Sequence, residues 1–295
     1  MFEKVRSLFG SGGVDTREVS GARNLVVRGF AESHPGMARE VNEDRVALHL
    51  RGLAQADRAT LAVVADGMGG SRGGEVASEL AIQLIPRLFF ESTLGMPQAL
   101  EQAIQTAGRE IFEHARRNPT LEGMGTTCVA LAIDPPFAWV AWVGDSRLYL
   151  IREGRLMQLT EDHSVVQEMV RRGLLTPDEA VHHSDRNLVT RSLGVHQSVE
   201  VGEREKPLLL KSGDAFLLCS DGLTDMLQAQ DLLSAIEGVP VDIACKSMIW
   251  EANRRGATDN VSAIVLTLSE PGSGGGGDLS ATREFNLSRL FKETR

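Results

Sequence analysis

Two apolar runs in this chain end on an aspartate that is followed at once by a glycine. The run LAVVA stops at Asp66 and Gly67, and the run AFLLCS stops at Asp221 and Gly222. Short apolar runs between turn residues are typical of buried strands. A strand holds the residue at its end rigidly, while glycine lets another group approach the backbone closely. The sequence therefore predicts a sheet-rich core whose strand ends hold carboxylates in fixed positions.

The same patterns extend over most of the chain. Eight runs have strand character: Asn24–Ala31, Arg45–Leu50, Thr60–Ala65, Thr126–Ile133, Ala138–Val143, Leu148–Ile151, Ala215–Cys219 and Val261–Leu268. Apolar residues have helical spacing in five segments: Gly74–Phe90, Pro97–Arg117, Ser164–Arg172, Asp231–Ile236 and Val241–Arg255. Many strands with a few long helices indicate an α+β domain in which helices cover sheets, although the pattern leaves the strand order open.

Composition argues against several classes of protein. Of the 295 residues, 42% are hydrophobic and 24% are charged, as in an ordinary globular protein. No apolar run approaches the roughly 20 residues of a membrane span, and the first ten residues lack the apolar stretch of a secretory signal. The net charge of −9 argues against nucleic acid as a partner. Cys128, Cys219 and Cys245 form no CxxC motif, which predicts buried thiols in a reducing compartment and hence a cytoplasmic protein.

The chain divides into three parts by composition. Residues 1–21 are rich in serine and glycine and predict a flexible segment, while residues 22–270 carry the strand and helix patterns of one domain. Residues 271–295 begin with the linker PGSGGGG and continue as a tail with scattered apolar residues. This tail is either a docking peptide or disordered, and we favour disorder.

Acidic residues mark the ends of several predicted strands. These are Glu43 and Asp44, then Asp66, Asp145, Asp221 and Asp259. A single acid at a strand end usually caps a turn or a helix, and Asp145 could simply pair with Arg147. Five such places in one domain indicate carboxylates that converge, and converging carboxylates repel one another unless a cation lies among them. Oxygen ligands favour Mg²⁺ or Mn²⁺, and no HExxH motif or Cys/His cluster argues for zinc.

The glycine-rich stretch after Asp66 has a second interpretation as a phosphate-binding loop at a helix N-terminus. It lacks the GK[ST] of a P-loop, however, and no GxGxxG joins a strand to a helix. We therefore favour the metal interpretation.

Seven ordered motifs carry a family resemblance. The string Arg39-x-x-x-Glu43-Asp44 is followed by VVADGMGG, GTTCVALAI, WVGDSRLYL, LTEDHS, LLCSDGLTDML and TDNVSAIVL. Together they resemble the metal-dependent protein phosphatase (PP2C) family, in its bacterial Ser/Thr phosphatase branch, over residues 24–268. The resemblance implies two packed antiparallel β-sheets flanked by α-helices, a four-layer αββα sandwich, with two metal ions bound at one end.

The resemblance also assigns roles to residues of this chain. Metal ligands are implied at Asp44, Asp66, the Gly67 carbonyl, Asp145, Asp221 and Asp259, with Asp66 between two tightly bound ions and Asp145 beside a third, weaker one. Arg39 would bind the substrate phosphate, Glu43 would act near the metals through water, and Asn260 would support Asp259. Residues 165–195 would form a variable flap near the substrate.

The implied activity is hydrolysis of phosphoserine and phosphothreonine monoesters in proteins by direct attack of a metal-activated water. Two bound Mn²⁺ or Mg²⁺ ions can lower the pKa of water and hold a phosphate in line for attack. Expected partners are phosphoproteins and a cognate bacterial Ser/Thr kinase, with the enzyme itself a monomer. Two alternatives are a catalytically silent sensor or scaffold of the same fold and a metal-dependent phosphodiesterase that acts on nucleic acid.

One departure concerns the proton that the leaving group needs. Many eukaryotic relatives have histidine directly after the first Asp-Gly pair, but this chain has Met68, which cannot donate a proton. His182 and His183 in the predicted flap are candidates by position only, and ordinary surface histidines are the favoured interpretation. His163 is expected to pack or cap the turn before the next helix.

Overall fold

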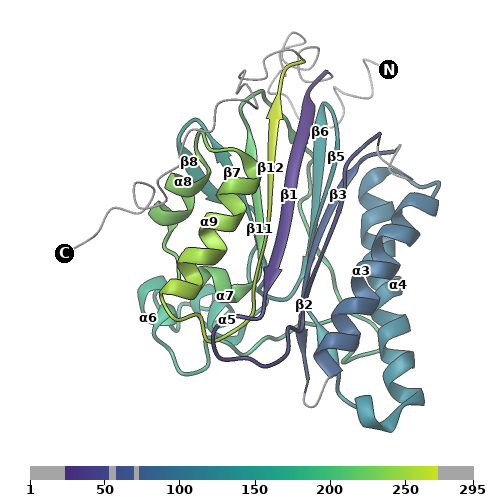
Figure 1. The fold of residues 1–295 in the computed structure, drawn as a ribbon. Coiled ribbons are helices and arrows are strands. Elements are labelled where there is room, and N and C mark those ends of the chain that lie inside the picture. The colour runs from purple at the N-terminus through teal and green to yellow at the C-terminus, as the bar shows by residue number, and fades with distance from the viewer. Residues whose placement is uncertain (1–23, 53–57, 70–72, 272–295) are drawn as a thin grey trace.

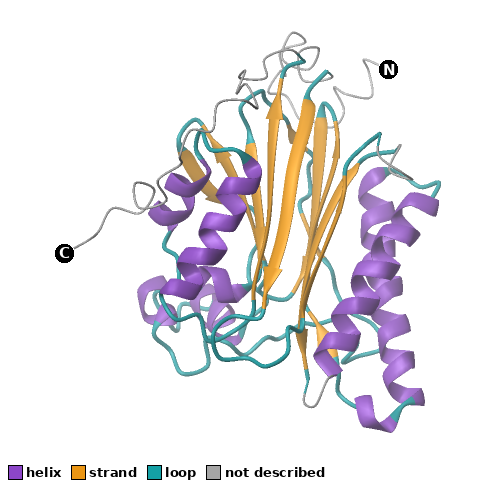
Figure 2. Cartoon of the chain, in the orientation of Figure 1, coloured by secondary structure: helices purple, strands orange, loops and turns teal. Residues whose placement is uncertain are grey.

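A computed structural model describes residues 24–52, 58–69 and 73–271. Figure 1 shows two β-sheets packed against each other in the middle of the molecule, with helices on the outer face of each sheet. Figure 2 shows the same four layers as orange strands between purple helices. The expectation of an α+β sandwich with two antiparallel sheets is thereby confirmed. The predicted N-terminal segment and residues 272–295 of the predicted tail lie outside the described residues.

Both sheets are antiparallel. The first has the order β1 (Val26–His34), β12 (Val261–Ser269), β11 (Ala215–Cys219), β7 (Arg147–Arg152) and β8 (Arg155–Gln158). The second has the order β10 (Leu208–Leu209), β6 (Phe137–Val143), β5 (Cys128–Asp134), β3 (Thr60–Met68) and β2 (Asp44–His49). Two further short strands, β4 (Gly125–Thr126) and β9 (Gly202–Glu203), pair with β3 and β6.

Two pairs of helices cover the sheets. The second sheet packs against α3 (Gly73–Glu91) and α4 (Met96–Arg117), and the first packs against α8 (Ala229–Ile236) and α9 (Val241–Arg254). Four short helices lie near one end of the sandwich: η1 (Pro119–Leu121), α5 (Val165–Arg171), α6 (Pro177–Val181) and α7 (Asp221–Thr224). Within the described part of the chain, no helix is long and apolar enough to cross a membrane.

Side chains alternate between the two faces of each strand. They form three apolar layers, one between the sheets and one between each sheet and its helices. In β3, Leu61, Val63 and Ala65 pack toward α3 and α4, while Ala62 and Val64 face the other sheet. All five are fully buried, which is why this strand is a continuous apolar run with no polar alternation. A strand that is buried on both faces is held firmly, and its end is a rigid place for a functional side chain.

The eight predicted strands and five predicted helices are present, and the differences have local causes. Thr127 interrupts the predicted strand Thr126–Ile133, which splits into β4 and β5. Strand β3 continues through Asp66 to Met68, because β4 pairs with its last two residues. The sequence did not predict β8, β9, β10, α6 or α7, all short elements of two to five residues held by tertiary contacts.

Candidate metal centre

The acids that the sequence singled out come together at one end of the sandwich. Asp44 begins β2, Asp66 lies near the end of β3, and Asp145 occupies the turn between β6 and β7. Asp221 begins α7 directly after β11, and Asp259 precedes β12. Because neighbouring strands are antiparallel, the starts of β2 and β12 meet the ends of β3 and β11 at the same edge, the lower end in Figure 1.

Asp44 and Asp66 lie directly opposite each other on β2 and β3. Burial raises the pKa of Asp66 well above its ordinary value, and repulsion from Asp44, Asp221, Asp145 and Asp259 adds to this. Burial likewise raises the pKa of Asp44 to about 6 and that of Asp221 to about 8. Buried acids that raise one another's pKa form an arrangement that a bound cation would stabilise.

Threonines of the GTT motif hold Asp66 in place. The backbone N–H of Asp66 donates to Oγ1 of Thr127 at 3.0 Å, and the Asp66 carbonyl accepts from Oγ1 of Thr126 and from the N–H of Thr127. Oγ1 of Thr127 also lies 2.7 Å from Oγ of Ser146, the residue after Asp145. This chain of buried hydroxyls therefore links two of the predicted metal ligands, a link that is not predicted from the sequence.

Close backbone packing explains why glycine follows two of the aspartates. A Cβ atom at Gly67 would lie 2.2 Å from the carbonyl oxygen of Gly74, at the start of α3. A Cβ atom at Gly222 would lie 2.0 Å from the carbonyl oxygen of Asn260. Neither glycine has the positive φ that L-residues avoid, so the requirement is space. In each case the missing side chain lets a second backbone segment approach the aspartate.

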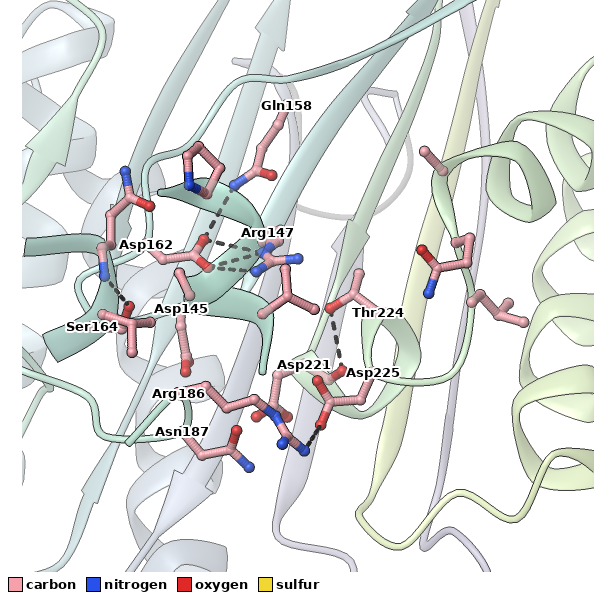
Figure 3. A pocket seen from close by; sticks show the side chains of 18 of the residues that line it. Asp145, Arg147, Gln158, Asp162, Ser164, Arg186, Asn187, Asp221, Thr224 and Asp225 are labelled. Atoms are coloured by element: carbon pink, nitrogen blue, oxygen red, sulfur yellow. Dashed lines mark hydrogen bonds and ion pairs between the residues drawn. The ribbon is translucent and has the colours of Figure 1, made fainter. Parts of the chain in front are cut away.

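A cavity of about 680 Å³ opens beside Asp145 and Asp221. Its other walls come from β7, β8, α5 to α8 and the segment after α6. Figure 3 shows Asp145, Asp221 and Asp225 on one side of the cavity, with Arg186 and Asn187 beside them. Arg186 forms an ion pair of 3.8 Å with Asp225, so a residue of the predicted flap contacts α7 and its C-cap.

The turn that carries Asp145 differs from the simplest expectation. Arg147 does not form an ion pair with Asp145 among the described residues but binds Asp162, with Nη2 2.6 Å from Oδ2. Asp145 is 8% exposed, and burial raises its pKa to about 6, with repulsion from Asp162 as the next cause. Asp145 does lie in a turn, but the alternative in which it pairs with Arg147 is wrong.

Arg39, Glu43 and Asn260 lie beside Asp44 and Asp259, and the exposed Arg39 marks the open side of the cluster. Arg39 is half exposed and donates to Oδ2 of Asp259 at 2.8 Å. The side chain of Asn260 accepts from the N–H of Glu43 and donates to the carbonyls of Pro35 and Val41, while its backbone N–H binds Oδ1 of Asp259. Asn260 thus joins the loop that carries Arg39 and Glu43 to the loop that carries Asp259.

Glu43 reaches the first turn of α3. Its carboxylate accepts a hydrogen bond from the backbone of Glu75, and a Cβ atom at Gly74 would lie 2.8 Å from its Oε1. Burial raises the pKa of Glu43, and this hydrogen bond opposes the shift. A carboxylate at a helix N-terminus is stabilised by the free N–H groups there. Glu43 therefore anchors α3 to the acidic edge, the end of the sandwich where Asp44, Asp66, Asp145, Asp221 and Asp259 lie.

His182 and His183 of the predicted flap and His163 before α5 occupy different positions. His182 is exposed and lines the cavity, while Nδ1 of the partly buried His183 accepts from the N–H of Asp185. His163 stacks on Trp142, and its Nδ1 accepts from the N–H of Gly144. The expectation that His163 packs at the turn before α5 is confirmed, although Ser164 is the residue that caps this helix.

The donor set suits a hard divalent cation. Its members are carboxylates and a backbone carbonyl, and Oδ1 of the buried Asp44 has no hydrogen-bond partner among the described residues. In the described part of the chain, no three His, Cys, Asp or Glu side chains are placed closely enough to hold an ion as they stand. A cation bound among these carboxylates would compensate the repulsion between them.

Comparisons with known proteins show which family this chain is similar to. A family model described as protein phosphatase 2C matches residues 37–244. The chain is 35% identical to the serine/threonine phosphatase Stp of Listeria innocua over 237 residues, which cover 78% of this chain and 92% of that protein. It is 37% identical to the serine/threonine protein phosphatase PstP of Mycobacterium tuberculosis over 245 residues, which cover 82% of this chain and 45% of that protein.

Solved structures of a serine/threonine phosphatase also superpose on this chain. The crystal structure of the PstP phosphatase of M. tuberculosis superposes with a TM-score of 0.74 at 35% identity, covering 83% of this chain and all of that one. A structure of the PstP catalytic domain in complex with two manganese ions superposes with a TM-score of 0.72, also at 35% identity, covering 83% of this chain and all of that one.

Proposed function

This chain belongs to the protein phosphatase 2C family and is a metal-dependent protein serine/threonine phosphatase, and we propose that the acidic edge of its sandwich is the metal centre. The observation that carries the proposal is the meeting of Asp44, Asp66, Asp221 and Asp259 at one edge, with a buried carboxylate oxygen unpartnered there. The ligands would be Asp66 and the Gly67 carbonyl for one ion, and Asp66, Asp221 and Asp259 for the other, with Asp44 nearby.

The metals would supply hydroxide near neutral pH and neutralise charge on the phosphoryl oxygens. Residues of this chain would bind the substrate phosphate and hold the loops of the site in place. Arg39 lies at the open side of the cluster, where its planar guanidinium can bind two phosphate oxygens once it leaves Asp259. The carboxylate of Glu43 accepts a hydrogen bond from the backbone of Glu75, and its N–H donates to Asn260, which keeps the loop in place. Mn²⁺ and Mg²⁺ both suit these ligands.

Asp145 would hold a third, weaker ion together with Asp221. Both line the cavity next to the other acids, and Asp145 has no arginine partner among the described residues. A group held there could deliver the leaving-group proton, a role for which Met68 has no suitable atom. Residues 165–195 would act as the flap, because α5, α6 and Arg186 line the same cavity as Asp145 and Asp221.

The substrates would be phosphoserine and phosphothreonine in proteins, and a kinase that phosphorylates the same proteins would be the opposing enzyme. A cytoplasmic location and a monomeric state belong to the same proposal. They agree with the buried state of Cys128, Cys219 and Cys245 and with the acidic composition. The acidic composition also disfavours the phosphodiesterase alternative.

Three substrates test the proposal. These are p-nitrophenyl phosphate, a bis-ester analogue and a phosphothreonine peptide, each assayed with Mn²⁺ and with EDTA. We expect turnover of the two monoesters only, and only with metal. Turnover of the bis-ester would identify a phosphodiesterase. Absence of all turnover in a folded protein that binds Mn²⁺ would identify a catalytically silent relative.

A further inference from the structure

Asp44 is held by a serine from the opposite sheet. Asp44 is 1% exposed and begins β2 in the second sheet, while Ser220 is fully buried and follows β11 in the first. Oγ of Ser220 donates to Oδ2 of Asp44 at 2.7 Å. The other carboxylate oxygen, Oδ1, has no partner among the described residues. One oxygen of this acid is therefore fixed and the other remains available.

The direction of the serine hydroxyl is determined by a second contact. Oγ of Ser220 accepts from the N–H of Ser262 at 3.0 Å, and the N–H of Ser220 donates to the Ser262 carbonyl at 3.2 Å. Because the N–H of Ser262 occupies a lone pair of Oγ, the hydroxyl proton is directed to Asp44. Ser220 thus connects β12 of the first sheet to β2 of the second at the acidic edge.

We propose that Ser220 is a positioning residue of the metal centre, which holds Oδ2 of Asp44 so that Oδ1 faces the metal ions. The inference rests on the proposed function, since it requires metal binding at this edge. The dipeptide Ser220-Asp221 then serves the centre twice: the serine orients Asp44, and the aspartate supplies its own carboxylate. Groups that orient metal ligands through hydrogen bonds typically change metal affinity 10- to 100-fold when they are removed.

The test is Mn²⁺ titration by calorimetry of the EDTA-stripped full-length protein. We expect Ser220→Ala to weaken Mn²⁺ binding at least about 10-fold, because Oδ2 of Asp44 loses its partner in a buried place. The matched control is Ser247→Ala in α9, a helix that contains none of the predicted metal ligands, where a serine that is 1% exposed donates to the Ala244 carbonyl at 3.0 Å. This variant should bind Mn²⁺ within about twofold of wild type.

A second pair of variants keeps the test decisive if Ser220→Ala does not fold. Threonine and valine have nearly the same shape, and the extended backbone of Ser220 (φ −75°, ψ 168°) accepts both. Ser220→Thr keeps the hydroxyl and Ser220→Val lacks it, so we expect the threonine variant to bind Mn²⁺ at least about fivefold more tightly. Equal affinities would overturn the positioning role.

The outcomes also separate this inference from the proposed function. Wild-type protein that binds Mn²⁺ and hydrolyses monoesters, together with Ser220→Ala of unchanged Mn²⁺ affinity, would overturn the positioning role alone. Wild-type protein that does not bind Mn²⁺ would overturn both. A weakened Ser220→Ala whose turnover of p-nitrophenyl phosphate recovers at high Mn²⁺ would support the inference, because a positioning residue changes how much metal is bound.

Discussion

At the scale of single residues, Asp66 has the most constrained position in the site. It lies opposite Asp44, its backbone is bound by Thr126 and Thr127, and no larger residue than glycine fits after it. Such a residue can place its carboxylate between two cations without a change in the surrounding strands. The consequences of removing its charge are therefore chemical more than structural.

Asp66→Asn keeps the size of the side chain and removes one negative charge from the centre. We expect kcat to fall by at least about two orders of magnitude while the fold is retained. Steady-state kinetics at saturating Mn²⁺ measure kcat, and circular dichroism shows whether the fold is retained. Asp134→Asn is the control, since Asp134 ends β5 and pairs with Arg51 at the other end of the sheet. Wild-type kcat in Asp66→Asn would remove this residue from the centre.

Arg39 is expected to bind the substrate phosphate. Arg39→Ala should chiefly raise KM, by about 10-fold, if the guanidinium contacts ground and transition states alike. Arg51→Ala removes an arginine that forms a comparable ion pair away from the acids and should leave KM unchanged. A large fall in kcat at unchanged KM would show that Arg39 acts on the transition state only, and no effect would show that it does not touch the substrate.

Substitution of Asp145 tests where the leaving group obtains its proton. If Asp145 holds a third ion that provides it, Asp145→Ala should lower kcat much more for a phosphoserine peptide than for p-nitrophenyl phosphate. The reason is that p-nitrophenolate leaves without a proton, whereas the serine alkoxide needs one. Kinetics on both substrates and metal analysis measure the difference. Equal losses on the two substrates at unchanged metal content would contradict the proton-donor role.

At the scale of elements, the turn between β6 and β7 depends on His163. Its Nδ1 accepts from Gly144 at 3.1 Å and its ring stacks on Trp142 at a centroid distance of 6.0 Å. Burial, aided by Arg191, lowers the pKa of His163 to about 4. The unfolded chain therefore binds more protons than the folded protein between pH 6.5 and 4, so this histidine makes the free energy of unfolding fall as the pH falls through that window.

His163→Asn keeps an acceptor near the position of Nδ1 but does not titrate. Between pH 7.5 and pH 5, we expect wild type to lose about 1 kcal/mol more unfolding free energy than the variant, after allowance for partial exposure of the ring. Urea unfolding of wild type and variant at both pH values gives the four free energies of unfolding that the comparison needs. The buried carboxylates contribute equally to both proteins, so an identical pH dependence would mean that His163 is not held neutral in the fold.

At the scale of the whole molecule, β12 is the last strand of the sandwich along the chain. It pairs with β1 on one side and with β11 on the other. Truncation after Glu270 should therefore leave turnover of p-nitrophenyl phosphate and the melting temperature unchanged. Truncation after Ala263 removes most of β12 and should abolish folding, because it exposes the edges of both neighbouring strands. A collapse of turnover in the Glu270 truncation would show that the tail contributes to the domain.

The sequence by itself determined the longer helices and strands and the kind of chemistry. Continuous apolar runs such as Thr60–Ala65 are long enough to identify buried strands, and acids with no Cys/His cluster indicate a hard divalent cation. The ordered motifs then indicated the family. Each of these signals is local in the chain, so it can be found without knowing what lies beside it.

Only the tertiary structure decided which residues support the acids. Ser220 reaches Asp44 from another sheet, Thr127 binds Asp66 across the β3–β5 pair, and Arg147 prefers Asp162 over Asp145. The side chain of Asn260 holds the loop before β2, although its neighbour in sequence is Asp259. Serine, threonine and asparagine form such contacts with any nearby polar group, so their partners follow from the packing of the two sheets and leave no periodic signal in the sequence.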